Sequence, residues 1–314
     1  MILAGDIGGT KTLLGLFDAG PVRPRPRSVS SFVTGNYPSL GDIVGEFLTT
    51  EQVPDGAVEA AAFGVAGPVL GDTAELTNVA FTIDAPATAA AFAIARVRLL
   101  NDLEAMAYAV PVLEREELAV LQDGAARRGG NMALIAAGTG LGQALLHHVE
   151  GRYIPSPTEA GHADWAPRTE RDLTLFRMLT SRYGRAEVEH VVSGIGLPHV
   201  HRSTHSAPCA AGIDPDDPDA PAATTRAGLD RQCPMCVEAL ELFVEAYGAE
   251  AGNLALRTVA TGGVFVGGGI APKILPALSD GGFMRAFCDK GAMRPLVSRI
   301  PVQVILNSEA GLLG

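Results

Sequence analysis

Residues 2–17 read ILAGDIGGTKTLLGLF. Two apolar runs, at 2–7 and 12–17, flank the turn Gly8-Gly9-Thr10-Lys11, and this pattern predicts a β-hairpin at the start of the chain. A second apolar strand, Gly/Thr turn and apolar strand occurs at 132–148, around Gly138-Thr139-Gly140. The internal repeat is weak, but it favours a two-lobed protein with duplicated cores.

Outside the hairpins, helical and extended apolar spacings alternate along the chain. The predicted helices cover 39–50, 86–95 and 237–258, and the predicted strands cover 58–66, 96–100 and 261–269. Strands that alternate with helices are typical of an α/β architecture. Residues 203–232 are rich in Pro, Ala, Asp and Ser without periodicity, so we expect a surface loop or a mobile insertion there.

Length, composition and charge limit the classes of protein to which this chain can belong. The 314 residues suffice for one or two α/β-sized domains, and 47% hydrophobic residues can build a substantial core. A formal charge of −11 argues against nucleic acid or anionic lipid as a partner. The opening apolar run is cut by Asp6 and has no basic flank, so it predicts neither a signal peptide nor a membrane span. Four unevenly spaced cysteines fit a reducing compartment, and we expect a cytoplasmic protein.

The first turn carries groups suited to phosphate. Gly8 and Gly9 let the backbone approach a phosphate closely, and Thr10 and Lys11 add a hydroxyl and a positive charge. Asp6 could hold a water of a Mg²⁺ shell, since Mg²⁺ takes one or two carboxylates and keeps most of its waters. A plain hairpin turn with an aspartate at its edge gives the same short pattern, so both interpretations stay open.

Two later strands also end in glycine-rich turns. Gly138-Thr139-Gly140 offers the same phosphate-binding groups without an acid, and Gly267-Gly268-Gly269 would let an adenine or ribose lie flat against the backbone. Either could be an ordinary turn. Three such clusters at the ends of predicted strands favour a nucleotide site.

Two further pairs of polar residues are candidates for chemistry. Asn101-Asp102 follows a predicted strand, where α/β folds build their sites, but Asn and Asp are also favoured helix N-caps. Glu159 and His162 have a spacing known from helical metal ligands, yet the surrounding Pro and Gly residues argue against a helix. A loop that offers a carboxylate and an imidazole to sugar hydroxyls suits them better, with a solvated loop as the alternative.

The segment Cys233-Pro234-Met235-Cys236 is a CxxC, with Cys209 and several histidines upstream. Such a set could form a zinc knuckle. Pro234 inside the pair, the long irregular spacer and the lack of a second compact pair argue against it. We therefore expect no protein-bound metal and an incidental or structural cysteine pair.

Together these motifs resemble the bacterial glucokinase family, within the hexokinase, actin and heat-shock ATPase superfamily. The similar stretches are Ala4-Gly5-Asp6-Ile7-Gly8-Gly9-Thr10, Tyr37-Pro38-Ser39-Leu40, Leu99-Leu100-Asn101-Asp102, Ala137-Gly138-Thr139-Gly140-Leu141-Gly142, Glu159-Ala160-Gly161-His162, Val192-Ser193-Gly194, Gly262-Gly263-Val264-Phe265 and Gly311-Leu312-Leu313-Gly314. Their order and spacing are more specific than any single motif.

The resemblance implies a two-domain actin-like ATPase (ribonuclease H-like) fold with an interdomain cleft that closes over glucose and ATP. A smaller N-terminal domain at 1–102 would carry the phosphate hairpin, and a larger domain at 103–314 would carry the sugar loops and the nucleotide glycines. The implied reaction transfers the γ-phosphoryl group of ATP, with Mg²⁺, to the 6-hydroxyl of glucose, and the implied assembly is a homodimer.

The resemblance also assigns roles to residues. Asp102 would be the catalytic base, and Asn101, Glu159, His162 and Glu189 would bind the glucose hydroxyls. The nucleotide and its phosphates would be bound by Gly5, Asp6, Ile7, Gly8, Gly9, Thr10, Gly138, Thr139, Gly140 and Gly268. The chain departs from the family after Thr77-Asn78, where Val79-Ala80-Phe81 replaces the usual tryptophan segment. A kinase for another hexose, and a non-catalytic actin-like nucleotide-binding protein, remain the alternatives.

Overall fold

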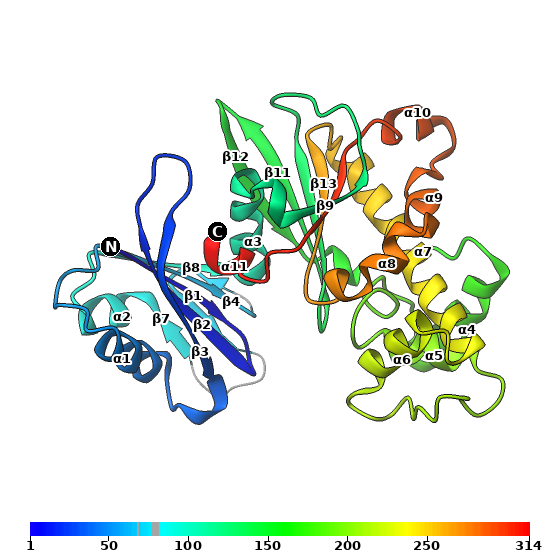
Figure 1. Ribbon diagram of the computed structural model, residues 1–314, viewed down its shortest axis with the longest axis horizontal. Coiled ribbons are helices and arrows are strands. Elements are labelled where there is room, and N and C mark those ends of the chain that lie inside the picture. The colour runs from blue at the N-terminus through cyan, green and yellow to red at the C-terminus, as the bar shows by residue number, and fades with distance from the viewer. Residues whose placement is uncertain (68, 77–81) are drawn as a thin grey trace. The chain divides into compact units, whose positions relative to one another are not determined.

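The structure is a computed structural model that describes residues 1–67, 69–76 and 82–314 (Figure 1). They form two compact units, Met1–Leu113 with Glu309–Gly314, and Glu114–Ser308. The first unit therefore runs beyond residue 102, where we expected it to end, and includes the last residues of the chain. The segment Val79-Ala80-Phe81, where the chain departs from the family pattern, lies outside the described residues.

The first unit is built on a five-stranded sheet of order β3-β2-β1-β4-β8. Its strands are β1 (Ile2–Ile7), β2 (Lys11–Asp18), β3 (Arg25–Val33), β4 (Ala60–Val65) and β8 (Arg96–Asn101). β1 and β2 form the predicted hairpin, while β1, β4 and β8 run parallel. A small antiparallel sheet contains β5 (Val69–Leu70), β6 (Thr73–Glu75) and β7 (Thr82–Asp84).

The helices of the first unit are α1 (Leu40–Thr50), α2 (Ala85–Ala91), α3 (Asp102–Ala109) and α11 (Ala310–Leu313), with 3₁₀ turns at Thr34–Asn36 and Val110–Val112. Helix α1 begins at the cap Ser39, whose hydroxyl accepts from the Asp42 N–H. Its apolar stripe, with Ile43, Val44 and Phe47, is buried against the sheet. The helix predicted at 39–50 is confirmed.

The second unit repeats the strand order of the first. Its sheet runs β12-β11-β10-β13-β14-β9. The strands are β9 (Leu118–Gln122), β10 (Met132–Ala137), β11 (Leu141–Val149), β12 (Arg152–Thr158), β13 (Gly263–Gly267) and β14 (Val302–Ile305). β12, β11 and β10 are antiparallel neighbours, as β3, β2 and β1 are in the first unit. β10, β13 and β14 are parallel neighbours, as β1, β4 and β8 are. The duplicated core predicted from the two hairpins is present.

The longest helix of the second unit, α7 (Pro234–Thr258), packs on this sheet through buried residues such as Phe243, Tyr247 and Leu254. The other helices are α4 (Glu170–Tyr183), α5 (Leu197–Thr204), α6 (Ala220–Leu229), α8 (Leu275–Ser279), α9 (Gly282–Cys288) and α10 (Arg294–Val297), with 3₁₀ turns at Arg115–Glu117, Ala160–His162, Ala271–Ile274 and Gly291–Met293. Within the described residues, no helix combines the length and the apolarity that crossing a membrane requires.

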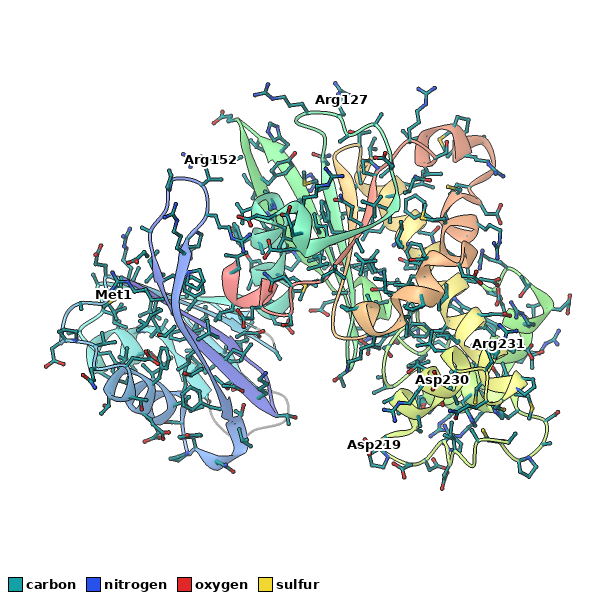
Figure 2. All side chains as sticks on the ribbon, viewed as in Figure 1. Met1, Arg127, Arg152, Asp219, Asp230 and Arg231 are labelled. Atoms are coloured by element: carbon teal, nitrogen blue, oxygen red, sulfur yellow. The ribbon has the colours of Figure 1, made fainter. Side chains whose placement is uncertain are left out.

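The expectation of an irregular loop across 203–232 is wrong, because α6 lies within it. Figure 2 labels Asp219 and Asp230 at the two ends of this helix. Small residues let α6 lie close to α7: a Cβ on Gly228 would come within 2.7 Å of the Cys236 carbonyl oxygen. The helix is stabilised by this close packing rather than by a stripe of large apolar residues, which is why apolar spacing did not reveal it.

Candidate active site

The first candidate group lies at the ends of two parallel strands in the first unit. β1 and β8 both pair with β4, so Asp6 and Asp102 come to the same edge of the sheet. Burial, and secondarily the charge of Asp102, raise the pKa of Asp6 to about 6, while Lys11 acts in the opposite direction. Two carboxylates far apart in the sequence are therefore electrostatic neighbours.

The turn between β1 and β2 is held by hydrogen bonds. The Gly8 N–H donates to the Lys11 carbonyl at 3.0 Å, and the Thr34 hydroxyl donates to the Gly8 carbonyl at 2.8 Å. The side chains of Thr10 and Lys11 are exposed at the tip. Backbone fixed in this way, with a hydroxyl and an ammonium beside it, can bind an anion.

Two of the residues predicted around this turn are buried in the sheet. Ile7 belongs to the core, and a Cβ on Gly5 would lie 2.5 Å from the Phe63 ring. Their surroundings indicate packing, and their contact with a nucleotide stays a prediction.

The sequence left open whether Asn101 and Asp102 cap a helix or form part of a site, and the structure gives the two residues different positions. The Asn101 side chain caps α3, since its Oδ1 accepts from the N–H groups of Leu103 at 3.0 Å and Glu104 at 3.4 Å. Asp102 is exposed at the first helical position, and its Oδ1 also accepts from Leu103 at 2.8 Å. The cap therefore does not depend on the charge of Asp102.

In the second unit, the turn 138–140 is fixed by backbone and by one carboxylate. Gly194 donates to the Gly138 carbonyl at 2.8 Å, and Ile195 donates to the Thr139 carbonyl at 3.2 Å. The Leu141 N–H donates to Glu189 Oε2 at 2.7 Å. Glu189 thus supports the turn, and its predicted role as a sugar ligand stays a prediction.

The predicted sugar residues of this unit surround His162. A hydrogen bond from Nδ1 to Glu187, at 2.9 Å, raises the pKa of His162, and the charges of Glu189 and Glu159 raise it further. Glu159 and His162 are exposed. This arrangement presents carboxylates and an oriented imidazole to solvent, which is the chemistry that binds hydroxyl groups.

A cavity of about 550 Å³ opens beside the second turn. Its walls come from the turn, α5, α6 and the 3₁₀ turn at Ala271–Ile274, and they are largely apolar with three basic side chains, Arg182, Arg202 and Lys273. Arg202 forms an ion pair with Asp216, which also lines the cavity. The size and the mixed walls suit an aromatic ligand that carries phosphates.

The strand ends beside this turn are held by a buried tyrosine and a glycine. The Tyr247 hydroxyl accepts from the Ala137 N–H at 3.1 Å and lies 3.2 Å from the carbonyl oxygens of Ile135 and Gly267. Gly268 has φ +83°, and a Cβ there would lie 2.3 Å from the Ala137 carbonyl oxygen. Only glycine allows this approach. Gly268 does not line the cavity, so its contact with a nucleotide stays a prediction.

Comparison with known proteins places the chain in a family. The family model for glucokinase matches residues 3–314, and a glucokinase from Nostoc sp. (strain PCC 7120) is 38% identical over 100% of this chain and 97% of its own length. The chain belongs to the glucokinase family. A family member from Synechocystis sp. is 39% identical, over 99% of this chain and 96% of its own.

Solved structures of glucokinases share the fold. A glucokinase from an Antarctic psychrotroph has a TM-score of 0.87 and 27% identity, over 99% of this chain and 96% of its own. A more distant structure, of a ROK family glucokinase from Streptomyces griseus in complex with glucose and AMPPNP, has a TM-score of 0.66 and 21% identity, over 99% of this chain and 96% of its own. The resemblance inferred from the motifs is confirmed at the level of family and fold.

Sequence reasoning missed Glu187 and the three basic residues of the cavity. Glu187 stands two residues before Glu189 in the run Glu187-Val188-Glu189-His190, and this density of ionisable groups was an available signal. Arg182, Arg202 and Lys273 come from different elements, and only their shared cavity relates them.

Proposed function

We propose that this chain transfers the γ-phosphoryl group of ATP to the 6-hydroxyl of glucose, giving glucose 6-phosphate and ADP. The observation that carries the proposal is the pair Asp6 and Asp102, close enough for one charge to raise the pKa of the other, in a chain that matches the glucokinase family from residue 3 to 314. Structures of relatives in complex with glucose, and with glucose and AMPPNP, support both substrates.

Asp102 acts as the general base. Its carboxylate accepts the proton of the 6-hydroxyl as the oxygen forms a bond to the γ-phosphorus, while the bond from the γ-phosphorus to the leaving ADP oxygen breaks. Little covalent assistance is needed in phosphoryl transfer, so positioning and charge neutralisation supply most of the rate. The exposed location of Asp102, with the cap supplied by Asn101, leaves it suited to this role.

The other glucose hydroxyls are bound by Asn101, Glu159, His162 and Glu189. Glu187 orients the imidazole by accepting from Nδ1, so that Nε2 is directed to the sugar. A site that hydrogen-bonds each hydroxyl discriminates against sugars that lack one, because its own polar groups would be left unpaired.

ATP is held by the glycine turns and the cavity of the second unit. Its phosphates contact Gly8, Gly9 and Thr10 and the turn 138–140, and its base and ribose enter the cavity near Gly268. Mg²⁺ fits the Asp6 carboxylate, which has a raised pKa that a bound cation would lower again. When bound, the cation neutralises charge on the phosphates.

A coupled assay with ATP and a panel of sugars tests the proposal. We expect glucose to give the highest kcat/KM, with ADP and polyphosphate inactive as donors. A higher kcat/KM for mannose, fructose or an amino sugar would indicate a kinase for another hexose. No turnover of any sugar with retained ATP binding would indicate a non-catalytic actin-like protein. We further propose that the protein is cytoplasmic and forms a homodimer. Light scattering measures the mass of the assembly and so tests the dimer.

A further inference from the structure

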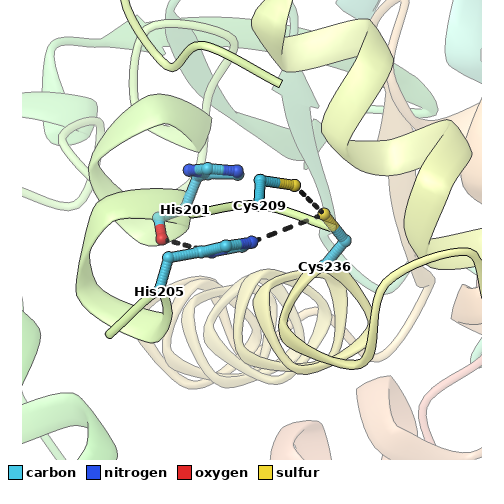
Figure 3. Close-up of side chains that lie close together, drawn as sticks. All are labelled: His201, His205, Cys209 and Cys236. Atoms are coloured by element: carbon cyan, nitrogen blue, oxygen red, sulfur yellow. Dashed lines mark hydrogen bonds between the residues drawn. The ribbon is translucent and has the colours of Figure 1, made fainter. Parts of the chain in front are cut away.

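Five side chains with metal-binding atoms gather beside the nucleotide cavity, outside the proposed catalytic residues. His201 lies on α5, and His205 and Cys209 follow the end of that helix. Cys233 caps the start of α7, and Cys236 lies in its first turn. Figure 3 shows the His201 and His205 rings one above the other, with the Cys209 and Cys236 sulfurs close together beside them. One ligand atom from each of these four lies within 4.8 Å of the others. We refer to all five residues as the Cys/His cluster.

The distances in the cluster match tetrahedral zinc coordination. With Zn–S bonds of about 2.3 Å and Zn–N bonds of about 2.0–2.1 Å, a tetrahedron places two sulfurs about 3.8 Å apart and a sulfur and a nitrogen about 3.6 Å apart. The Cys209 and Cys236 sulfurs are 3.6 Å apart. His205 Nε2 lies 3.7 Å from the Cys236 sulfur and 3.7 Å from the Cys233 sulfur. None of these cysteines forms a disulfide.

The hydrogen bonds of the two histidines leave ring nitrogens without a partner of the usual kind. His205 Nδ1 donates to the His201 carbonyl at 2.8 Å, which leaves the Nε2 lone pair directed at the sulfurs. The His201 side chain is buried, yet among the described residues neither of its ring nitrogens has a hydrogen-bond partner. A buried imidazole without a partner is costly, and a metal or a metal-bound thiolate would satisfy it.

The fourth ligand is decided by ring geometry. The His201 and His205 rings are stacked, with centroids 3.6 Å apart and an angle of 14° between their planes. An ion in the plane of one ring therefore lies outside the plane of the other. The Cys233 sulfur lies 3.7 Å from His205 Nε2, the nitrogen that faces the Cys236 sulfur, and it accepts from the backbone N–H groups of Ala210 and Cys236.

We propose that His205, Cys209, Cys233 and Cys236 bind one structural Zn²⁺ ion, with His201 donating a hydrogen bond to a bound thiolate. Thiolates and imidazole in a tetrahedron are the preferred ligands of zinc, and four protein ligands make a closed, non-catalytic site. The proposal revises the expectation of a metal-free chain with an incidental cysteine pair.

The ion would add a link between α5 and α7, which also share the main core of the unit through residues such as Val200 and Leu240. The cysteines belong to a small apolar cluster with Ala227, separate from the main core of the unit. Zinc would connect the end of α5 to the start of α7. Helix α6 lies between Cys209 and Cys233 in the sequence and contacts both of these helices. Leu197, Pro198 and Arg202 of α5 and Ala222 of α6 line the cavity, so the ion would hold two of its walls.

Metal content tests the site directly. The untagged wild-type chain, purified in metal-free buffer without chelator, should contain one equivalent of zinc by mass spectrometry. Treatment of the intact protein with a mercurial reagent should release that zinc in step with the modification of three thiols. Absence of stoichiometric zinc from protein whose cluster cysteines titrate as reduced thiols would overturn the proposal.

Single variants test the ligands. Cys209→Ser, Cys233→Ser, Cys236→Ser and His205→Gln should each lose most of the zinc, with a Tm lower by about 5 °C or more. Cys288→Ser and His147→Gln, outside the cluster, should keep the metal. Zinc retained in full by Cys209→Ser and Cys236→Ser would contradict the site.

Cobalt substitution tests the ligand set without relying on the stability of the variants. Co²⁺ bound in place of Zn²⁺ should show thiolate charge-transfer absorption with the intensity of three thiolates, and His201→Gln should leave that intensity unchanged. Loss of metal in His201→Gln together with retention in Cys233→Ser would overturn Cys233 as the fourth ligand.

The effect on the cavity rests on the proposed function, whereas the metal content does not. Zinc-depleted protein should show a severalfold higher KM for ATP and little change in the KM for glucose, with recovery when zinc is restored. An equal rise in both constants would overturn the link to the cavity, even with one equivalent of zinc present in the native chain.

Discussion

The two hairpins of this chain share a topology and differ in chemistry. In each unit an antiparallel pair carries a glycine turn, and a parallel strand lies beside the first strand of the pair: β4 beside β1, and β13 beside β10. Two residues before the first glycine of the turn, the chain has Asp6 in the first unit and Ala136 in the second. Both sheets therefore provide a glycine turn, but only the first has an acidic residue at this position.

The two turns are also held in different ways. The first depends on a side-chain hydroxyl, since Thr34 donates to the Gly8 carbonyl. The second is enclosed by the backbone of 194–195, by Glu189 and, behind it, by Tyr247. We infer that the first turn is adapted to carboxylate and cation chemistry and the second to rigid backbone contacts with a nucleotide.

Removing the acid of the first hairpin should increase stability at neutral pH. The pKa of Asp6 is about 6 in the folded chain against 3.8 ordinarily, so ionisation opposes folding: the stability is fully present below about pH 4 and is lost as pH rises through 6. Without a bound cation, Asp6→Asn should be more stable than wild type above pH 6 by up to about 3 kcal/mol, and equal to it near pH 4.

Denaturant unfolding across pH 4 to 8 measures this difference, with Asp55→Asn at an exposed position as the control. Asp6→Asn less stable than wild type at pH 8 would contradict the interpretation that the buried charge is unfavourable. The same variant should lose activity, since it lacks the carboxylate proposed for Mg²⁺.

Removing the tyrosine behind the second turn should destabilise the chain. Tyr247→Phe leaves the buried Ala137 N–H without its acceptor, at a cost of about 1–3 kcal/mol. Thermal unfolding against wild type gives the loss, and the KM for ATP should rise as the turn loosens. Tyr108→Phe, at an exposed position of the first unit, is the matched control. An unchanged Tm in Tyr247→Phe would mean that the hydroxyl is not required at the strand ends.

Two glycines of the second turn should respond differently to alanine. A Cβ on Gly140 would lie 2.5 Å from Glu189 Oε2 and displace that carboxylate from the Leu141 N–H, whereas a Cβ on Gly138 meets no described atom within 4 Å. Gly140→Ala should therefore cost about 1 kcal/mol of stability and raise the KM for ATP more than Gly138→Ala does. Equal effects in the two variants would argue against Glu189 as a support of the turn.

Apolar runs and apolar spacing predicted the elements that carry the two cores. The hairpins and the helices near 39–50 and 237–258 were found in this way. β12 was missed because it contains Pro155 and Pro157, which normally argue against a strand. It lies at the sheet edge and pairs only with β11, where prolines are tolerated.

The sequence allowed the types of residue in the candidate site to be predicted, but not which of them lie close together in space. Strand-end acids and glycine turns could be recognised singly, but the proximity of Asp6 and Asp102 depends on β1 and β8 flanking β4. Likewise the spacing from Cys209 to Cys233 fits no compact zinc motif, because α6 fills the interval and returns the chain to the cluster. Contacts made by tertiary packing leave little trace in local spacing.

The central claim is that Asp102 is the general base, and one variant tests it. Asn101 caps α3, and an amide at position 102 still accepts a hydrogen bond, so Asp102→Asn should keep its Tm and its affinity for glucose. Loss of proton acceptance should lower kcat by ~10²-fold to 10⁴-fold, about 3 to 5 kcal/mol of barrier. Steady-state kinetics, thermal unfolding and glucose titration on this variant measure all three quantities. A folded variant that binds glucose and turns over at nearly the wild-type rate would contradict the mechanism.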